Sequence, residues 1–153
     1  MVTTTLNKIG EHSPCKDGWE KLLNHLGKTK TDDEPLAFKA ILESNGLIDT
    51  LWCLRSLDKG YHPKIRLMAA DFAERVLHIY EKKYPNDNRP RLAIKAARDY
   101  ANGSISEKDL KTAEAFALAA SAAAYAASAY DAAYYTEREI QSEILLKYFG
   151  EEK

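Results

Sequence analysis

One stretch decides the fold: residues 113–133, which read AEAFALAASAAAYAASAYDAA. Alanine is the best helix former, and no Gly or Pro interrupts the chain from Ser104 to Phe149. The start of the helix is marked by Ser106 as an N-cap with Asp109 at N3, and by Ile105 and Leu110 at the positions of a hydrophobic staple. Because a helix that is apolar almost all round is a buried one, this pattern predicts a long C-terminal helix at the centre of a helical domain.

The rest of the chain predicts further helices that pack around this one. Helical spacing of apolar residues, with Pro near most of the starts and Gly or Asn near the ends, marks segments at about 14–26, 35–45, 47–57, 62–83 and 89–101. Leu6 and Ile9 indicate a short helical turn before them. With about six helices, no convincing strand and short loops, we expect an all-α, single-domain helical bundle over residues 1–153.

The most regular amphipathic pattern is that of the 62–83 segment. Its apolar residues recur every three or four positions, which predicts that they form the buried stripe of the helix: Ile65, Met68, Phe72, Val76 and Ile79.

The length of the last helix raises a second question. A helix over residues 106–149 would be roughly 65 Å long, whereas a compact domain of this size is on the order of 40 Å wide. The segment therefore either breaks between Asp131 and Glu137 or projects as a C-terminal arm over residues 136–149. A projecting end would expose apolar surface that a homodimer contact or a partner would cover, so Tyr134, Tyr135 and Tyr148 are candidate interface residues, with a core role equally open for the first two.

Composition narrows the class of protein. The formal net charge is −1, so no global field points to nucleic acid or to an anionic membrane. The uncharged run from Ala115 to Tyr130 is shorter than the roughly 20 residues of a membrane span. No signal peptide is recognisable and Cys15 and Cys53 allow only one disulfide, so we expect two free thiols in a soluble, cytoplasmic protein.

The charge is unevenly distributed along the chain. Residues 62–99 carry nine basic and five acidic residues, whereas residues 100–153 carry five basic and nine acidic residues. Arg91, Lys95 and Arg98 share one helix face and Arg89 precedes them, which makes these four residues a candidate partner-binding site. The alternative is a solvated face whose arginines pair with carboxylates of neighbouring helices. Binding of nucleic acid or nucleotides by residues 89–98 is a further alternative, which the acidic C-terminal segment opposes.

No catalytic or metal-binding motif emerges from the sequence. His12 and Cys15 stand three apart, but no second pair with zinc spacing follows, so no metal is expected. The pairs Asp71 and Glu74, and Glu137 and Glu139, have the spacing of helix-surface carboxylates. A glycine-rich phosphate loop, a nucleophile elbow and a His-Glu-x-x-His motif are all missing, so no catalytic residue and no cofactor are predicted.

Three blocks of residues together resemble a known protein family. Residues 66–77 read RLMAADFAERVL, residues 87–98 read DNRPRLAIKAAR, and Asn102-Gly103 lead into the alanine-rich helix. This combination resembles the bacterial and phage family labelled "putative immunity protein", over about residues 51–135. The N-terminal part, with residues 40–47 reading AILESNGL, resembles the longer members often found in phages.

The resemblance implies an all-α protein that binds another protein, either a toxin that it neutralises or a component of a host defence system. We therefore expect a non-enzymatic inhibitor that acts by occluding its partner, as an immunity protein or as an anti-CRISPR-like counter-defence factor. A self-assembling structural protein is the remaining alternative.

Overall fold

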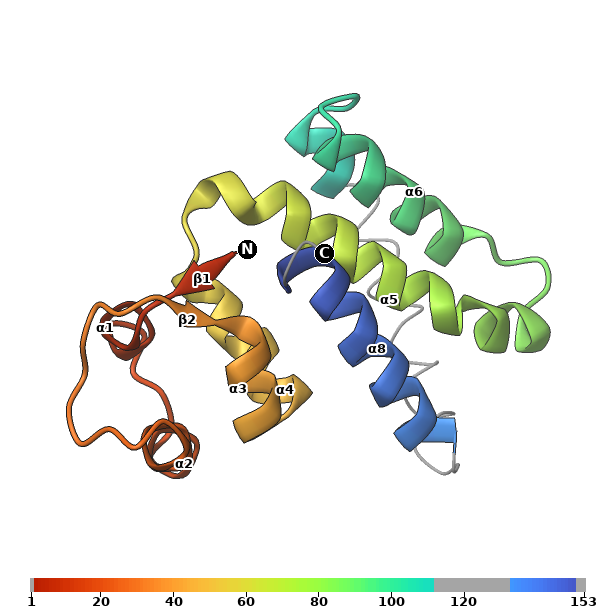
Figure 1. Cartoon of the computed structure of the whole chain (residues 1–153). Coiled ribbons are helices and arrows are strands. Elements are labelled where there is room, and N and C mark those ends of the chain that lie inside the picture. Colours follow the sequence, from red (N-terminus) through yellow and green to blue (C-terminus); the bar gives the residue numbers. More distant parts are fainter. Residues whose placement is uncertain (1, 112–132, 151–153) are drawn as a thin grey trace. The chain divides into compact units, whose positions relative to one another are not determined.

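The computed structural model describes residues 2–111 and 133–150, and its side chains are described in these ranges except at 133–136. The contacts divide the chain into two compact units. The first comprises residues up to Tyr61 together with those from Ile140 onward, and the second comprises His62–Glu139. The prediction of a single domain over 1–153 with an arm at 136–149 stays a prediction. Figure 1 shows that both units consist mainly of helices.

The first unit packs short helices against a minimal sheet. Strand β1 (Thr3–Thr4) pairs antiparallel with β2 (Leu36–Ala37), with Thr3 opposite Ala37 and Thr4 opposite Leu36 (Figure 1). The helices in this unit are α1 (Leu6–Gly10), α2 (Lys16–His25), α3 (Phe38–Asn45) and α4 (Leu47–Cys53), followed by the 3-10 turns η1 (Leu54–Ser56) and η2 (Lys59–Tyr61).

The core of the first unit joins both ends of the chain. Phe38 of α3 and Phe149 near the C-terminus are fully buried, and their ring centroids lie 5.7 Å apart. Leu145 is buried in the same unit, as are Leu6, Ile9 and Ile41. The end of the last helix is therefore part of this core, and burial of a Phe of this kind stabilises the fold by about 3 kcal/mol.

Two predictions for this unit were wrong. The sequence showed no convincing strand, yet Leu36 and Ala37 are extended, because their backbone groups pair with β1 and the helix begins only at Phe38. The segment at about 14–26 was predicted to begin with Pro14 in its first turn, but its N-cap is Cys15 and the helix begins at Lys16. Ser13 has a φ of 55°, in the left-handed region, which turns the chain before the helix can start.

The second unit is built on two long helices that lie side by side. Helix α5 (His62–Lys83) and helix α6 (Arg89–Ala101) are joined by residues 84–88 and make the most extensive contact between two helices in the described part of the chain (Figure 1). Both ranges confirm the prediction. The expected apolar stripe of α5 is only partly right, because Val76 and Ile79 are 37% and 40% exposed. Leu77 and Tyr80 are buried in their place, since the helix is rotated by about one position.

The start of the alanine-rich segment has the predicted cap. The backbone N–H of Asp109 donates to Oγ of Ser106, and the backbone N–H of Ser106 donates to Oδ2 of Asp109. Residues 107–111 are helical and Leu110 is buried. Helix α8 (Ala133–Phe149) has 17 residues. The predicted central role of residues 112–132, and the choice between one helix and two, lie outside the described residues.

Candidate partner-binding site

The predicted basic residues all lie at the start of α6 or along it, and each contacts a carboxylate. Arg89 is held by Asp87 through Nε at 2.8 Å and Nη2 at 2.5 Å. Asp87 also accepts a 2.6 Å hydrogen bond from the hydroxyl of the buried Tyr80. The Arg89 guanidinium, followed by the Tyr80 hydroxyl, holds the pKa of Asp87 well below its usual range, so this carboxylate stays ionised at neutral pH.

The remaining three cations pair along the helices. Arg91 binds Glu81 of α5 with two parallel hydrogen bonds of 2.8 and 2.9 Å. Lys95 pairs with Asp99 one turn further along α6. Arg98 contacts two carboxylates of α5, Asp71 at 2.7 Å and Glu74 at 2.5 Å. Burial disfavours the charged form of Arg98, but the hydrogen bonds and charges of Asp71 and Glu74 together outweigh this effect, so the pKa of Arg98 is raised.

These contacts balance the positive charge of the four basic residues. The four cations meet five carboxylates, which are Asp71, Glu74, Glu81, Asp87 and Asp99. They are also the only five acidic residues between His62 and Asp99, so every local carboxylate takes part in the pairing. The structure therefore brings the predicted basic residues together as an ion-paired surface between α5 and α6, the alternative that the sequence left open.

The surface also has an exposed apolar residue that the sequence analysis did not select. Leu92 is 52% exposed, and its position one residue after Arg91 and three before Lys95 puts all three within about 100° of the helix circumference. We call Arg91, Leu92 and Lys95 the α6 face. Its two cations are exposed at their outer sides, with 58% and 70% of their side chains accessible to solvent.

Of the three predicted tyrosines, the structure describes the side chain of Tyr148 alone. Tyr148 belongs to the first unit, is half-buried, and lies with its ring centroid 6.4 Å from that of Phe149. The side chains of Tyr134 and Tyr135 lie outside the described residues, so their interface role stays a prediction.

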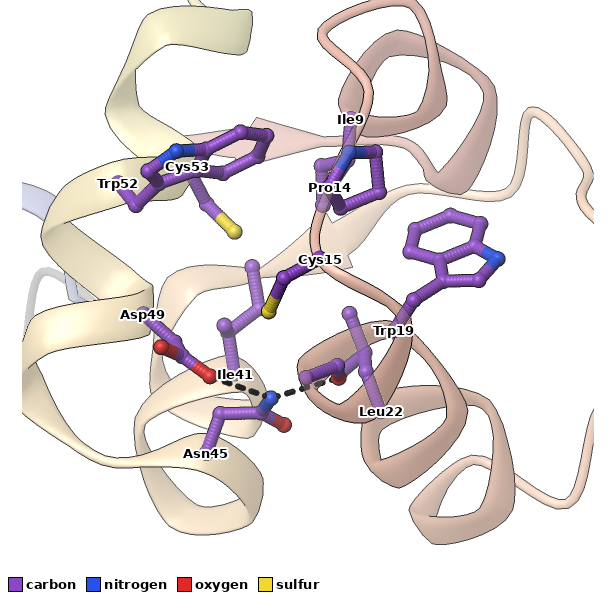
Figure 2. Close-up of a pocket in the computed structure, with 11 residues that line it drawn as sticks. Ile9, Pro14, Cys15, Trp19, Leu22, Ile41, Asn45, Asp49, Trp52 and Cys53 are labelled. Carbon is purple, nitrogen blue, oxygen red and sulfur yellow. Dashed lines mark hydrogen bonds between the residues drawn. The ribbon is translucent and has the colours of Figure 1, made fainter.

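A second candidate site is a pocket of about 180 Å³ in the first unit, between α2, α3 and α4, with Ile9 of α1 and the turn before α2 also in its lining. Its floor consists of buried apolar residues, and its rim carries Trp19, Trp52, Cys15 and Asp49 (Figure 2). Both tryptophans and both cysteines of the chain line it. The full lining is Ile9, Pro14, Cys15, Gly18, Trp19, Leu22, Ile41, Asn45, Asp49, Trp52 and Cys53.

Polar contacts hold one side of this pocket in place. The amide nitrogen of Asn45 donates to the carbonyl of Gly18 at 2.8 Å and to Oδ2 of Asp49 at 2.9 Å, which ties α3 to α2 and α4 (Figure 2). A Cβ at Gly18 would lie 3.0 Å from Oδ2 of Asp49 and 3.1 Å from Sγ of Cys15. The glycine that weakens α2 on propensity grounds is thus the residue that lets α4 approach.

The two thiols of the pocket differ in environment. Cys15 is exposed at the N-cap of α2, whereas Cys53 is buried. Burial, with a further contribution from the Asp49 charge, raises the pKa of Cys53 to about 12, so its thiol is neutral and unreactive at physiological pH. Neither thiol belongs to a metal-binding group, since the described side chains contain no cluster of three or more His, Cys, Asp or Glu residues suited to a metal ion.

Comparison with known protein families identifies the family to which this chain belongs. The family model described as "Imm-5 like putative immunity protein" matches residues 55–138, more than half of the chain, and the chain belongs to this family. The match includes α5, α6 and the α6 face, whereas every residue of the pocket lies N-terminal to it. No curated protein and no solved structure matches the chain. Within the ranges that the structure describes, no helix is long and apolar enough to cross a membrane.

Proposed function

We propose that this protein is a cytoplasmic immunity protein that neutralises a toxin by binding it and blocking its working surface, without catalysing a reaction. Membership of an immunity family supports the role. The observation that carries the mechanism is the α6 face, which lies inside the family-matched segment and combines an exposed leucine with two exposed cations.

The geometry of this face suits tight protein binding. Arg91 is fixed by its two hydrogen bonds to Glu81, and Lys95 is oriented by Asp99, so little side-chain freedom is lost when a partner binds. Leu92 offers an apolar contact that the neighbouring charges surround, an arrangement typical of energetically dominant interface residues. The carboxylates beside the cations exclude partners with the wrong charge pattern, which gives specificity.

The same charge balance argues against the alternative of nucleic-acid binding. Binding of nucleic acid needs cations that are free to neutralise phosphates and so to displace the counterions condensed on the nucleic acid. On this helix the four cations are already matched by five carboxylates. A gel shift with single- and double-stranded DNA and RNA at 50 mM salt should give no retarded band. A band that weakens steeply as salt rises would favour the alternative.

The proposal is tested by co-expression with toxins encoded by the same genome. Wild-type protein should restore growth of cells that express the cognate toxin, and Leu92→Asp and Lys95→Glu should each lose most of this protection. Lys82→Glu is the matched control, because Lys82 is an exposed lysine of α5 outside the α6 face and should keep full protection. The proposal would be refuted if the wild-type protein protected against none of the toxins, or if all variants protected equally.

A counter-defence role would act by the same mechanism on a different partner. In that case the protein would protect an infecting phage against a host defence system, and the same two α6 variants would lose that protection. The control at Lys82 serves both assays.

A further inference from the structure

The pocket between α2, α3 and α4 has the size of a single side chain. Ile9, Leu22 and Ile41 are almost completely buried and form its floor with Cys53. An apolar cavity of about 150 Å³ accepts benzene in another protein. A pocket of about 180 Å³ therefore has room for one ring or one branched alkyl group, and it is too small for a cofactor.

The rim of the pocket carries one negative charge. Asp49 is the only charged residue among those that line it. Its Oδ2 accepts the bond from Asn45, a neutral donor, and no Lys or Arg of the described chain forms an ion pair with it. A ligand with its apolar group in the floor would thus meet an anion at the entrance.

The surface beside the pocket indicates a macromolecular ligand. Ile48 is 60% exposed and precedes Trp52 by one helical turn, so apolar surface continues from the rim along α4. The Trp52 ring already stacks with a cation, since the guanidinium carbon of Arg55 lies 4.1 Å from its centroid. A free small molecule would fill the pocket without covering Ile48, whereas a protein segment covers both.

We propose that this pocket is a second docking site for the protein partner. It receives one phenylalanine- or leucine-sized side chain, and a lysine or arginine next to that side chain pairs with Asp49. The proposal rests on the proposed function for the existence of a protein partner. Because the pocket lies outside the family-matched segment, it adds contacts that the family segment lacks, and so determines which partner this chain selects.

The chemistry of the pocket can be measured without any partner. The probe is 2-phenylethylammonium, with the uncharged 2-phenylethanol as its isostere, and the readout is intrinsic fluorescence, because both tryptophans line the pocket. Saturable binding is expected for the cation and roughly tenfold weaker binding for the alcohol. The bound probe should also slow alkylation of Cys15 by N-ethylmaleimide, since the exposed thiol lies at the rim.

Variants identify the carboxylate that recognises the cation. Asp49→Asn keeps the shape and should remove the preference for the cation, whereas Asp17→Asn, an exposed control on α2, should retain it. No saturable binding of either compound, equal binding of the two, or an unchanged preference in Asp49→Asn would overturn the proposed chemistry.

The toxin assay separates this proposal from the proposed function. Asp49→Asn should reduce protection at low expression levels, and Ile48→Ser should do so as well without any effect on folding, because Ile48 is a surface residue. If both variants protect like wild type while Leu92→Asp does not, the pocket is not a docking site, although the immunity function stands. If wild type protects against no toxin but the probe binds as expected, the proposed function fails and the pocket chemistry survives.

Discussion

Arg98 of α6 and Asp71 of α5 form an ion pair in which Nη1 lies 2.7 Å from Oδ1. The other end of the same guanidinium contacts Glu74 at 2.5 Å, so one side chain binds two carboxylates that stand three residues apart on α5. Both Arg98 and Asp71 are about two-thirds or more buried at their side chains, unlike Lys95, which is mostly exposed. The pairs on this surface therefore differ in what they contribute to stability.

Replacement of Arg98 by Ala should lower the free energy of unfolding by about 1.5–3 kcal/mol, because two charge-assisted hydrogen bonds are lost and the partly buried Asp71 loses its partner. Lys95→Ala should cost less than about 0.5 kcal/mol, since exposed i,i+4 pairs contribute little. Urea denaturation of both variants tests this difference. Equal losses would show that the Arg98 contacts add nothing beyond an exposed pair.

The second prediction concerns the thiol of Cys53 and the stability of the protein at alkaline pH. The pKa of Cys53 is raised to about 12 by burial, whereas the thiol of the unfolded chain titrates near pH 9.0. Between pH 9 and pH 12 the native state binds more protons than the unfolded state. The contribution of the Cys53 thiol to the free energy of unfolding is therefore fully present below pH 9 and is lost as the pH rises toward 12. Between pH 9 and pH 10 the wild type should lose about 1 kcal/mol more than Cys53→Ala does.

Parallel denaturation curves of the two proteins at pH 9 and pH 10 measure this effect. Groups other than Cys53 titrate in both proteins and cancel in the comparison. An identical pH dependence would mean that Cys53 is not buried as the structure has it.

The third prediction concerns Gly18, where two effects oppose each other. Helix propensity alone says that Gly18→Ala stabilises the protein by about 1 kcal/mol. The structure says the opposite, because the new Cβ would lie 3.0 Å from Oδ2 of Asp49 and 3.1 Å from Sγ of Cys15. Since overpacking costs typically 1–3 kcal/mol, we expect a net loss of up to about 2 kcal/mol.

Gly60→Ala is the matched control for this substitution, because a Cβ there meets no atom within 4 Å and the φ angle of Gly60 is not positive. It should change the stability by less than about 0.5 kcal/mol. Thermal unfolding of the two variants decides the sign of the effect. A more stable Gly18→Ala protein would show that the side chains of Asp49 and Cys15 move aside at little cost.

The sequence predicted the parts of the structure that depend on local signals. The range of α5 follows from periodicity and His62-Pro63, and the cap at Ser106 follows from residue types at fixed spacing. The extended pair Leu36 and Ala37 could not be predicted, because its partner β1 lies more than thirty residues away and each strand has only two residues. The rotation of α5 likewise depends on which side α6 covers, which periodicity alone does not specify.

The two candidate sites differ in the same way, because one depends on local sequence signals and the other on contacts between distant residues. Arg91, Lys95 and Arg98 are close in sequence, so helical spacing alone predicts that they share one side of α6. The carboxylates that pair with Arg98 come from a different helix, which the spacing does not predict. The pocket is assembled from α1, α2, α3 and α4 and the turn before α2. The two signals in the sequence were Gly18 inside an amphipathic helix and the pair of cysteines, and neither specifies a contact without the fold.

The last prediction compares two adjacent aromatic residues at the C-terminus. Phe149 is fully buried against Phe38, so Phe149→Ala should cost about 3–5 kcal/mol, enough to unfold much of a domain of marginal stability. Tyr148 is half-buried, and Tyr148→Ala should cost less than about 2 kcal/mol and leave a folded protein. Circular dichroism and urea denaturation separate these outcomes. A folded Tyr148→Ala variant can then enter the toxin assay, where a loss of protection would identify Tyr148 as an interface residue. If Phe149→Ala is the milder change of the two, the C-terminal turn of α8 does not belong to the core of the first unit, and the packing with Phe38 is wrong.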